Sequence, residues 1–477
     1  MLFTSINFLA FAVLFIPFYW VVCRLKWRNA ILIAGSLVFY GAGDWRRCGL
    51  LLFVGATNYV AGWVLHSFPA RKRVILPVFI GINLLLLFSF KYVRWFLETL
   101  SAIPALQDGR WLHVASDQCA SLDYSMAIGL SFFCFQGLTY TIGVARGNIA
   151  YCRNILDVLA FQSLFPVILA GPICRAEHLL PQLREPQAVT NAGVGAGFRL
   201  ISLGMFKKMA IADSLVPFVD QIFDAPVVSA SAWLWGVAVL AFTEQIYCDF
   251  SGYSDIAIGL GKLLGFDFNA NFNRPYISTT LTEFWRRWHM SLSTWFRDYV
   301  YIPLGGSRRG SMRSVCNLWL TMVLSGVWHG AAWTYVAWGA YHGTILAVEK
   351  LLGVARKPPG KLPVRLLQWL LVFILVAFGW LVFRARSLAQ VCDVVRVFAD
   401  PGAWAPGAVL GNSLMPNTLL VIMVFCLFGA AGMLWLRLRS RIPERGALLA
   451  EQLVSVLLAL MAIFFRGPGR EFIYFQY

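Results

Sequence analysis

The chain has 477 residues, of which 59% are hydrophobic and 13% are charged. Soluble domains contain about 45 to 50% apolar residues, so the composition excludes an ordinary water-soluble fold. The net charge of +17 would suit a nucleic-acid-binding protein, but no soluble basic domain lies between the apolar stretches. Lys and Arg in cytoplasmic loops, which set the topology of a membrane protein, account for the excess positive charge.

The first apolar stretch covers residues 1–22, and positive charge follows it directly at Arg24, Lys26 and Arg28. A cleavable signal peptide has the opposite order, with its charge before the apolar stretch. We therefore expect an uncleaved first helix whose N-terminus lies outside and whose following loop, residues 23–28, is cytoplasmic.

Ten further apolar runs follow in chain order. They occupy residues 29–43, 48–66, 74–90, 125–145, 155–172, 232–247, 317–348, 366–383, 416–436 and 446–465. At roughly 20 residues for each span, they predict about ten to twelve hydrophobic helices, some of them short or re-entrant. No fixed-period repeat or long linker separates them. The sequence thus predicts an all-α polytopic membrane protein with one transmembrane domain over residues 1–477.

The polar interruption at residues 266–316 is the most informative one. Thr280 and Glu283 have the spacing of a capping box, which predicts a helix that begins near Leu281. Several charged or imidazole side chains follow: Arg286, Arg287, His289, Arg297 and Asp298. In lipid, each Arg or Asp would cost about 2.5 to 3.5 kcal/mol. With Trp285, Trp288 and Trp295 between them, the pattern predicts an interfacial or cavity-lining helix.

The apolar run 317–348 contains His329 and His342. An ionisable group inside a spanning segment is a functional candidate, and a structural histidine with one hydrogen bond is the competing interpretation. Both interpretations stay open for His329, and the structural one is favoured for His342. On an unbroken helix the two would lie about 220° apart and form no local pair. Gly326 and Gly330 have a spacing typical of close helix packing.

Several motifs in this region resemble the membrane-bound O-acyltransferase family, most closely its alginate and cellulose O-acetyltransferase branch. They are Arg274-Pro-Tyr, residues 283–293, the run that begins Arg297-Asp-Tyr-Val-Tyr-Ile-Pro-Leu-Gly-Gly, and Val327-Trp-His-Gly. Asp249-Phe-Ser-Gly-Tyr-Ser-Asp255 and the C-terminal residues 470–477 resemble the same branch. The sharpest motifs cover residues 245–345, and the layout is similar over most of the chain.

The resemblance implies a bundle of membrane helices around a funnel, with a catalytic histidine deep inside it. His329 matches the family's essential histidine, and His289 matches a position that members fill with His, Asn or Asp. Acyl transfer from a thioester to a hydroxyl needs a base, a role worth about 10² to 10⁴-fold that suits imidazole. We expect His329 to be this base. His289 would orient the acceptor or donate to the oxyanion, and the two roles could be exchanged.

The resemblance also implies the substrates and the location. Acetyl would pass from a cytoplasmic donor, expected to be acetyl-coenzyme A, to hydroxyls of an exported polysaccharide such as alginate or cellulose. Transfer would be direct or through a periplasmic acetyltransferase partner, in the bacterial inner membrane, with no bound cofactor or metal. Arg286 and Arg297 are candidates for contacting the coenzyme A phosphates, and ordinary loop charge is the competing explanation.

Three alternatives remain open: a flippase for a polysaccharide precursor, a scaffold that recruits another acetyltransferase, and D-alanyl transfer to teichoic acid. A transporter would often show paired repeats with interrupted helices in matching positions, and none is visible. The sequence also contains no GxSxG or HExxH motif and no phosphate-binding loop.

Overall fold

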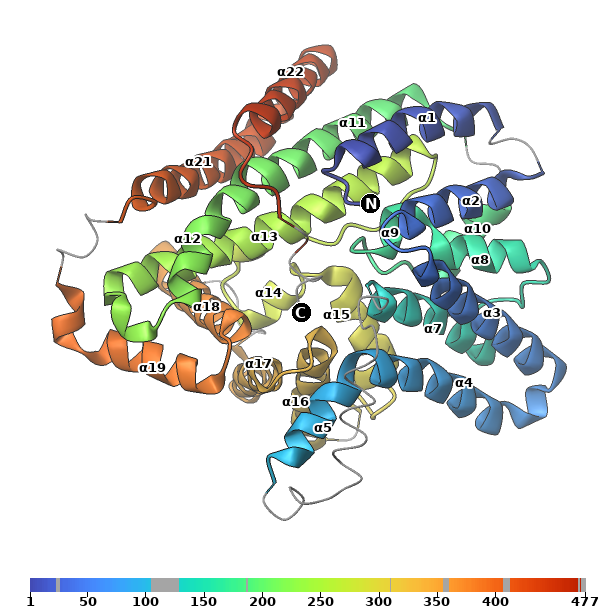
Figure 1. The fold of residues 1–477 in the computed structure, drawn as a ribbon, viewed down its shortest axis with the longest axis horizontal. Helices are drawn as coiled ribbons and strands as arrows, with labels where there is room; N and C mark the ends of the chain where they lie inside the picture. The colour runs from blue at the N-terminus through green and yellow to red at the C-terminus, as the bar shows by residue number, and fades with distance from the viewer. Residues whose placement is uncertain are drawn as a thin grey trace. The chain divides into compact units, whose positions relative to one another are not determined.

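A computed structural model describes residues 1–22, 26–103, 128–185, 188–308, 310–354, 360–405, 412–470 and 472 (Figure 1). Its regular elements are all helices, with no strand in these ranges, which confirms the predicted all-α fold. Part of the loop 23–28 and most of the C-terminal motif lie outside the described residues. The chain forms two compact units: unit 1 is residues 1–197 with 257–269, and unit 2 is residues 198–256 with 270–477. The single domain over residues 1–477 stays a prediction.

Among the residues that the structure describes, five helical stretches are long and apolar enough to cross a membrane. They are α3 (Arg46–Ser67), the stretch Pro69–Ser101 that contains α4 (Lys72–Leu87) and α5 (Val93–Ser101), α18 (Leu362–Arg384), α21 (Met415–Arg439) and α22 (Glu444–Phe464). A shorter apolar helix, α1, covers Ile6–Val22. The other predicted runs form helices that are shorter or less apolar. Five apolar stretches of this length indicate a multi-pass membrane protein.

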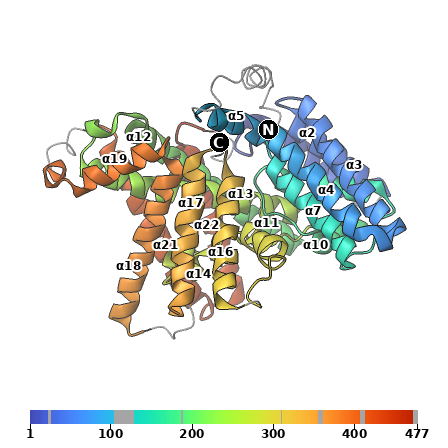
Figure 2. The ribbon, with the colours of Figure 1, turned by 90° about the horizontal axis from the view of Figure 1, so that it is seen from below.

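In unit 1, helices α3, α4 and α7 (Leu130–Arg146) lie side by side (Figures 1 and 2). A polar contact joins two of them, because the side-chain oxygen of Asn58 on α3 accepts a 2.8 Å hydrogen bond from Thr141 on α7. Gly137 permits this approach, since a Cβ there would lie 2.3 Å from the Asn58 amide nitrogen. Small residues and buried hydrogen bonds are common where membrane helices pack together.

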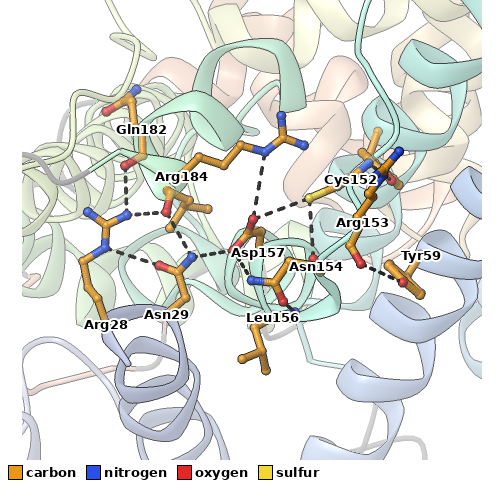
Figure 3. Close-up of polar contacts among 12 residues, drawn as sticks. Arg28, Asn29, Tyr59, Cys152, Arg153, Asn154, Leu156, Asp157, Gln182 and Arg184 are labelled. Carbon is orange, nitrogen blue, oxygen red and sulfur yellow. Dashed lines mark hydrogen bonds and ion pairs between the residues drawn. The ribbon is translucent and has the colours of Figure 1, made fainter. Parts of the chain in front are cut away.

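A second polar cluster in unit 1 joins α2 (Arg28–Gly41), α8 (Ile155–Ser163) and α10 (Ala176–Arg184) (Figure 3). The Arg28 guanidinium donates to the carbonyls of Leu183 and Glu185, where α10 ends. The Asp157 carboxylate accepts from Asn29 at 2.8 Å and from the α8 N-cap residue Asn154 at 3.0 Å. Because a helix C-terminus leaves carbonyls without helical partners, Arg28 stabilises the end of α10.

In unit 2, α16 (Ser311–His329) and α17 (Trp333–Leu351) form a hairpin, and α18 lies beside α17 (Figure 2). The predicted apolar run 317–348 is therefore two helices, and the separation of about 220° between His329 and His342 expected on an unbroken helix does not apply. Close packing explains the break. A Cβ on Gly326 would lie 2.2 Å from the Tyr335 carbonyl oxygen, and one on Gly330 would lie 2.2 Å from the Tyr335 ring. The chain must turn at Gly330 to bring Tyr335 back against α16.

This packing gives a first testable expectation. Gly326→Ala should lower thermal stability, because the new methyl group meets a backbone carbonyl that cannot rotate away, and overpacking costs about 1 to 3 kcal/mol. Gly432→Ala on α21 is the matched control, since it places the same methyl group in open space. The amount of protein that stays monodisperse in detergent after heating measures both. Equal thermal stability of the two variants would contradict the packing argument.

The remaining longer helices complete the two units. They are α11 (Asn191–Met205), α12 (Asp213–Asp224), α13 (Ala232–Leu263) and α19 (Leu388–Ala399), with a π-helical segment at Phe206–Ala212 between α11 and α12.

The predicted helix at Leu281 is present but short. It is α14 (Leu281–Trp285), and its N-cap Thr280 accepts a 3.0 Å hydrogen bond from the Glu283 amide, which confirms the predicted start. A second helix, α15 (Met290–Phe296), begins only after residues 286–289. The break has a physical cause: the backbone of residues 287–290 hydrogen-bonds to the preceding loop, with Asn273 donating to the Arg287 carbonyl and Met290 donating to the Asn271 carbonyl.

Candidate active site

His289 lies at the break between α14 and α15, in unit 2. Its backbone is left-handed, with φ 40° and ψ 55°, a conformation that is uncommon for a residue other than glycine. Such strain costs on the order of 1 to 3 kcal/mol and persists only where the surroundings impose it. The side chain is only 1% exposed. Backbone strain and burial together place this imidazole in one fixed position.

The electrostatics of His289 favour its neutral form. Its Nδ1 atom lies 3.1 Å from the side-chain oxygen of Asn271. Burial lowers the pKa of His289 to about 3, because a low-dielectric environment disfavours the charged imidazolium. Neutral imidazole is the form that can accept a proton, so His289 is in its basic form at physiological pH.

His329 is the last residue of α16 and is buried, with 4% exposure. Its ring packs against three aromatic rings, at centroid distances of 4.9 Å to Trp328, 5.0 Å to Trp338 and 5.4 Å to Phe383. Helix α16 ends here because Gly330 leaves the helical conformation. The histidine that the sequence placed within a span therefore sits at a helix end inside an aromatic cluster.

The structure brings the two predicted histidines into the same cluster. The ring of Trp328 lies 6.3 Å from that of His289 and 4.9 Å from that of His329. His342 is fully buried, and its ring lies 5.0 Å from that of Trp338. Both ring nitrogens of His342 lack a hydrogen-bond partner among the described residues. Because the helix breaks at Gly330, His329 and His342 both contact Trp338.

The two arginines predicted to bind the donor lie outside this cluster. Arg286 follows α14 and is exposed. Arg297 pairs with its neighbour Asp298 at 2.7 Å, and its side chain is 59% exposed. The structure records no contact of either arginine with His289 or His329 within its described ranges. Their role in donor binding stays a prediction.

Sequence reasoning missed the ion pairs that hold the motif of residues 249–255. Lys208 is buried and lies 2.7 Å from both Asp213 and Asp249. Lys207 lies 2.6 Å from Asp255. Removing one partner of a buried ion pair costs about 3 to 5 kcal/mol, so these contacts fix α13 against the π-helical segment. The available signal was the pair of adjacent lysines in a largely apolar stretch.

Sequence reasoning also missed Asn271. It is 1% exposed, and its side-chain oxygen contacts both His289 and Ser291. In the described ranges, no group of three or more His, Cys, Asp or Glu side chains could hold a metal ion. The site is thus built from imidazoles, amides and aromatic rings.

Comparison with known proteins identifies the family. Residues 145–390, which include both histidines, match the model of MBOAT, the membrane-bound O-acyltransferase family. The chain is 39% identical over 408 residues to "Probable alginate O-acetylase AlgI" of Pseudomonas putida, an alignment that covers 83% of this chain and 80% of that protein. It is 31% identical over 394 residues to "Peptidoglycan O-acetyltransferase" of Helicobacter pylori, with 76% and 72% covered. It is 28% identical over 275 residues to "Teichoic acid D-alanyltransferase" of Bacillus subtilis, with 54% and 69% covered. The chain belongs to the membrane-bound O-acyltransferase family and is a multi-pass membrane acyltransferase.

Proposed function

We propose that this protein transfers acetyl from cytoplasmic acetyl-coenzyme A towards hydroxyls of an exported polysaccharide, in the bacterial inner membrane. The observation that carries the proposal is the placement of His289 and His329, both buried, around the ring of Trp328. The names of the relatives support acetyl as the group and alginate as the first polymer to test, ahead of cellulose. D-alanyl transfer is the second candidate, and the teichoic acid relative favours it at lower identity and coverage.

In the proposed reaction, the acceptor oxygen attacks the thioester carbonyl, a C–O bond forms, and the C–S bond then breaks. His329 takes the hydroxyl proton as the bond forms and passes it to the departing coenzyme A thiolate. His289 orients the acceptor or stabilises the oxyanion. The aromatic rings around His329 exclude water and thereby suppress hydrolysis of the thioester. The acceptor is the polymer itself or a periplasmic partner that passes the acetyl group on.

The donor is tested with inverted membrane vesicles from polymer-producing cells supplied with radiolabelled acetyl-coenzyme A. Label should enter the polymer, or a protein that carries acetyl to it. Acetyl transfer that persists after coenzyme A is removed and another donor is supplied would contradict the donor assignment. D-alanine incorporation without acetyl incorporation would favour the second candidate.

Arg286→Ala and Arg297→Ala should raise the KM for acetyl-coenzyme A several-fold with little change in kcat, because charge-assisted hydrogen bonds to phosphate contribute to binding. Arg396→Ala is the matched control, since Arg396 is also exposed and paired with a neighbouring carboxylate, that of Asp393. An unchanged KM in both test variants would remove these arginines from the donor site.

A further inference from the structure

The side chain of Asn271 makes four polar contacts in unit 2. Its Oδ1 atom lies 3.1 Å from His289 Nδ1, 3.2 Å from the Ser291 backbone nitrogen and 2.9 Å from Ser291 Oγ. Its Nδ2 atom donates to Ser254 Oγ on α13 at 3.1 Å. A buried amide with both ends hydrogen-bonded is held in one orientation.

These contacts determine the tautomer of His289. The backbone N–H of Ser291 can only donate, so the group that faces it must be the Asn271 oxygen. An amide oxygen can only accept, so His289 Nδ1 must carry a hydrogen. A neutral imidazole has one N–H, and therefore the lone pair of His289 is on Nε2.

We propose that Asn271 is a positioning residue that fixes His289 as the Nδ1–H tautomer, so that Nε2 accepts a hydrogen bond from an acceptor hydroxyl beside the one whose proton His329 takes. This inference rests on the proposed acyl transfer and chooses between two roles of His289. A neutral Nδ1–H imidazole has no proton on Nε2 to donate to an oxyanion. His289 therefore engages the acceptor, and oxyanion stabilisation falls to other groups.

One further contact of Asn271 and one of Phe250 hold the backbone and the ring of His289. The backbone carbonyl of Asn271 accepts from Met290 at 2.8 Å, directly after the left-handed His289. The ring of His289 then packs edge-on against Phe250, with 4.5 Å between centroids. Backbone and ring are both fixed, so the tautomer and the direction of Nε2 are set together.

The charged groups around His289 matter for the test. Its ring neighbours Phe250, Phe272 and Trp328 carry no charge, and burial lowers its pKa. On the adjoining helix α13, Asp249 and Asp255 are paired with Lys208 and Lys207, respectively. His329 is a second titratable group in contact with Trp328. A carboxylate placed at position 271 would therefore be a new charge directly on His289.

The test compares Asn271→Asp and Asn271→Leu with Asn273→Asp, which changes an exposed side chain in the same loop. Acetyl transfer from radiolabelled acetyl-coenzyme A to polymer is measured in inverted vesicles between pH 5 and 8, per amount of folded protein. Asn271→Leu should lose about 100-fold at every pH, because an unheld His289 no longer engages the acceptor. Asn273→Asp should behave as the wild type.

The Asn271→Asp variant should have near wild-type acetyl-transfer activity at pH 8. Between pH 8 and pH 5 its activity should fall by up to roughly tenfold more than that of the wild type. An adjacent carboxylate raises the histidine pKa by about 1 to 3 units, and the acceptor role requires the neutral ring, so activity falls as pH falls towards that pKa. The inference is overturned if Asn271→Asp has the wild-type pH profile, or if Asn271→Leu retains full activity. If His329→Ala also remains active, the proposed function fails instead.

Discussion

His329→Ala is expected to abolish acetylation of the exported polymer while the protein stays in the membrane at its normal level. Loss of a general base costs about 10² to 10⁴-fold. His329 is the only His, Asp, Glu, Lys or Arg between Arg313 and His342, so no such neighbour on α16 can replace it. The readouts are the acetyl content of the polymer, the amount of polymer exported and the amount of folded protein.

His66→Ala is the matched control, because it removes an exposed histidine from α3 in unit 1. A purely structural role for His329 would instead reduce the folded protein, since a lost buried hydrogen bond costs about 1 to 3 kcal/mol. Normal acetylation at a normal protein level would falsify the enzyme mechanism and promote the flippase or scaffold alternative.

Sequence patterns predicted the features that depend on residues close together in the chain. The capping pair Thr280 and Glu283 predicted the first residue of α14, because a capping box acts within one helical turn. Apolar runs predicted the membrane helices, because lipid demands about 20 apolar residues for each span. The motif around His329 singled out a histidine that is buried in the structure, and its catalytic role stays a prediction.

Tertiary contacts determined the parts that were missed. The turn at Gly330 depends on Tyr335 folding back against Gly326, a contact that helical periodicity does not reveal. The left-handed backbone of His289 depends on hydrogen bonds with a loop some 16 to 18 residues earlier in the chain. Hydrophobic periodicity predicted neither break, because it contains no information about such partners.

Asn271 shows why a positioning residue is hard to find from one sequence. The loop contains Asn269, Asn271 and Asn273 at alternate positions, and nothing in this pattern distinguishes them. In the structure only Asn271 is buried, and the other two are exposed. Burial distinguishes Asn271 from the other two, and burial is a property of the fold.

His289→Ala should reduce acetylation about 100-fold or more, with residual activity from His329. The informative partner is His289→Asn. Asn tolerates a left-handed backbone better than Ala, so it should keep the loop in place, and its amide can still accept a hydrogen bond. Asn is shorter than His, however, so it holds the acceptor in a different position relative to His329. The Asn variant should therefore keep a near-normal KM for the acceptor with a reduced kcat, whereas the Ala variant should lose both.

These kinetics separate two contributions of His289. A full kcat in the Asn variant would show that His289 only holds the acceptor and that His329 performs all proton transfer. An equal loss in the Asn and Ala variants, at equal folded protein, would show that the proton affinity of Nε2 is essential. Wild-type activity in His289→Ala would remove His289 from the site altogether. Since Asn271 leaves the lone pair on Nε2, we expect the intermediate behaviour, in which the Asn variant retains binding and loses rate.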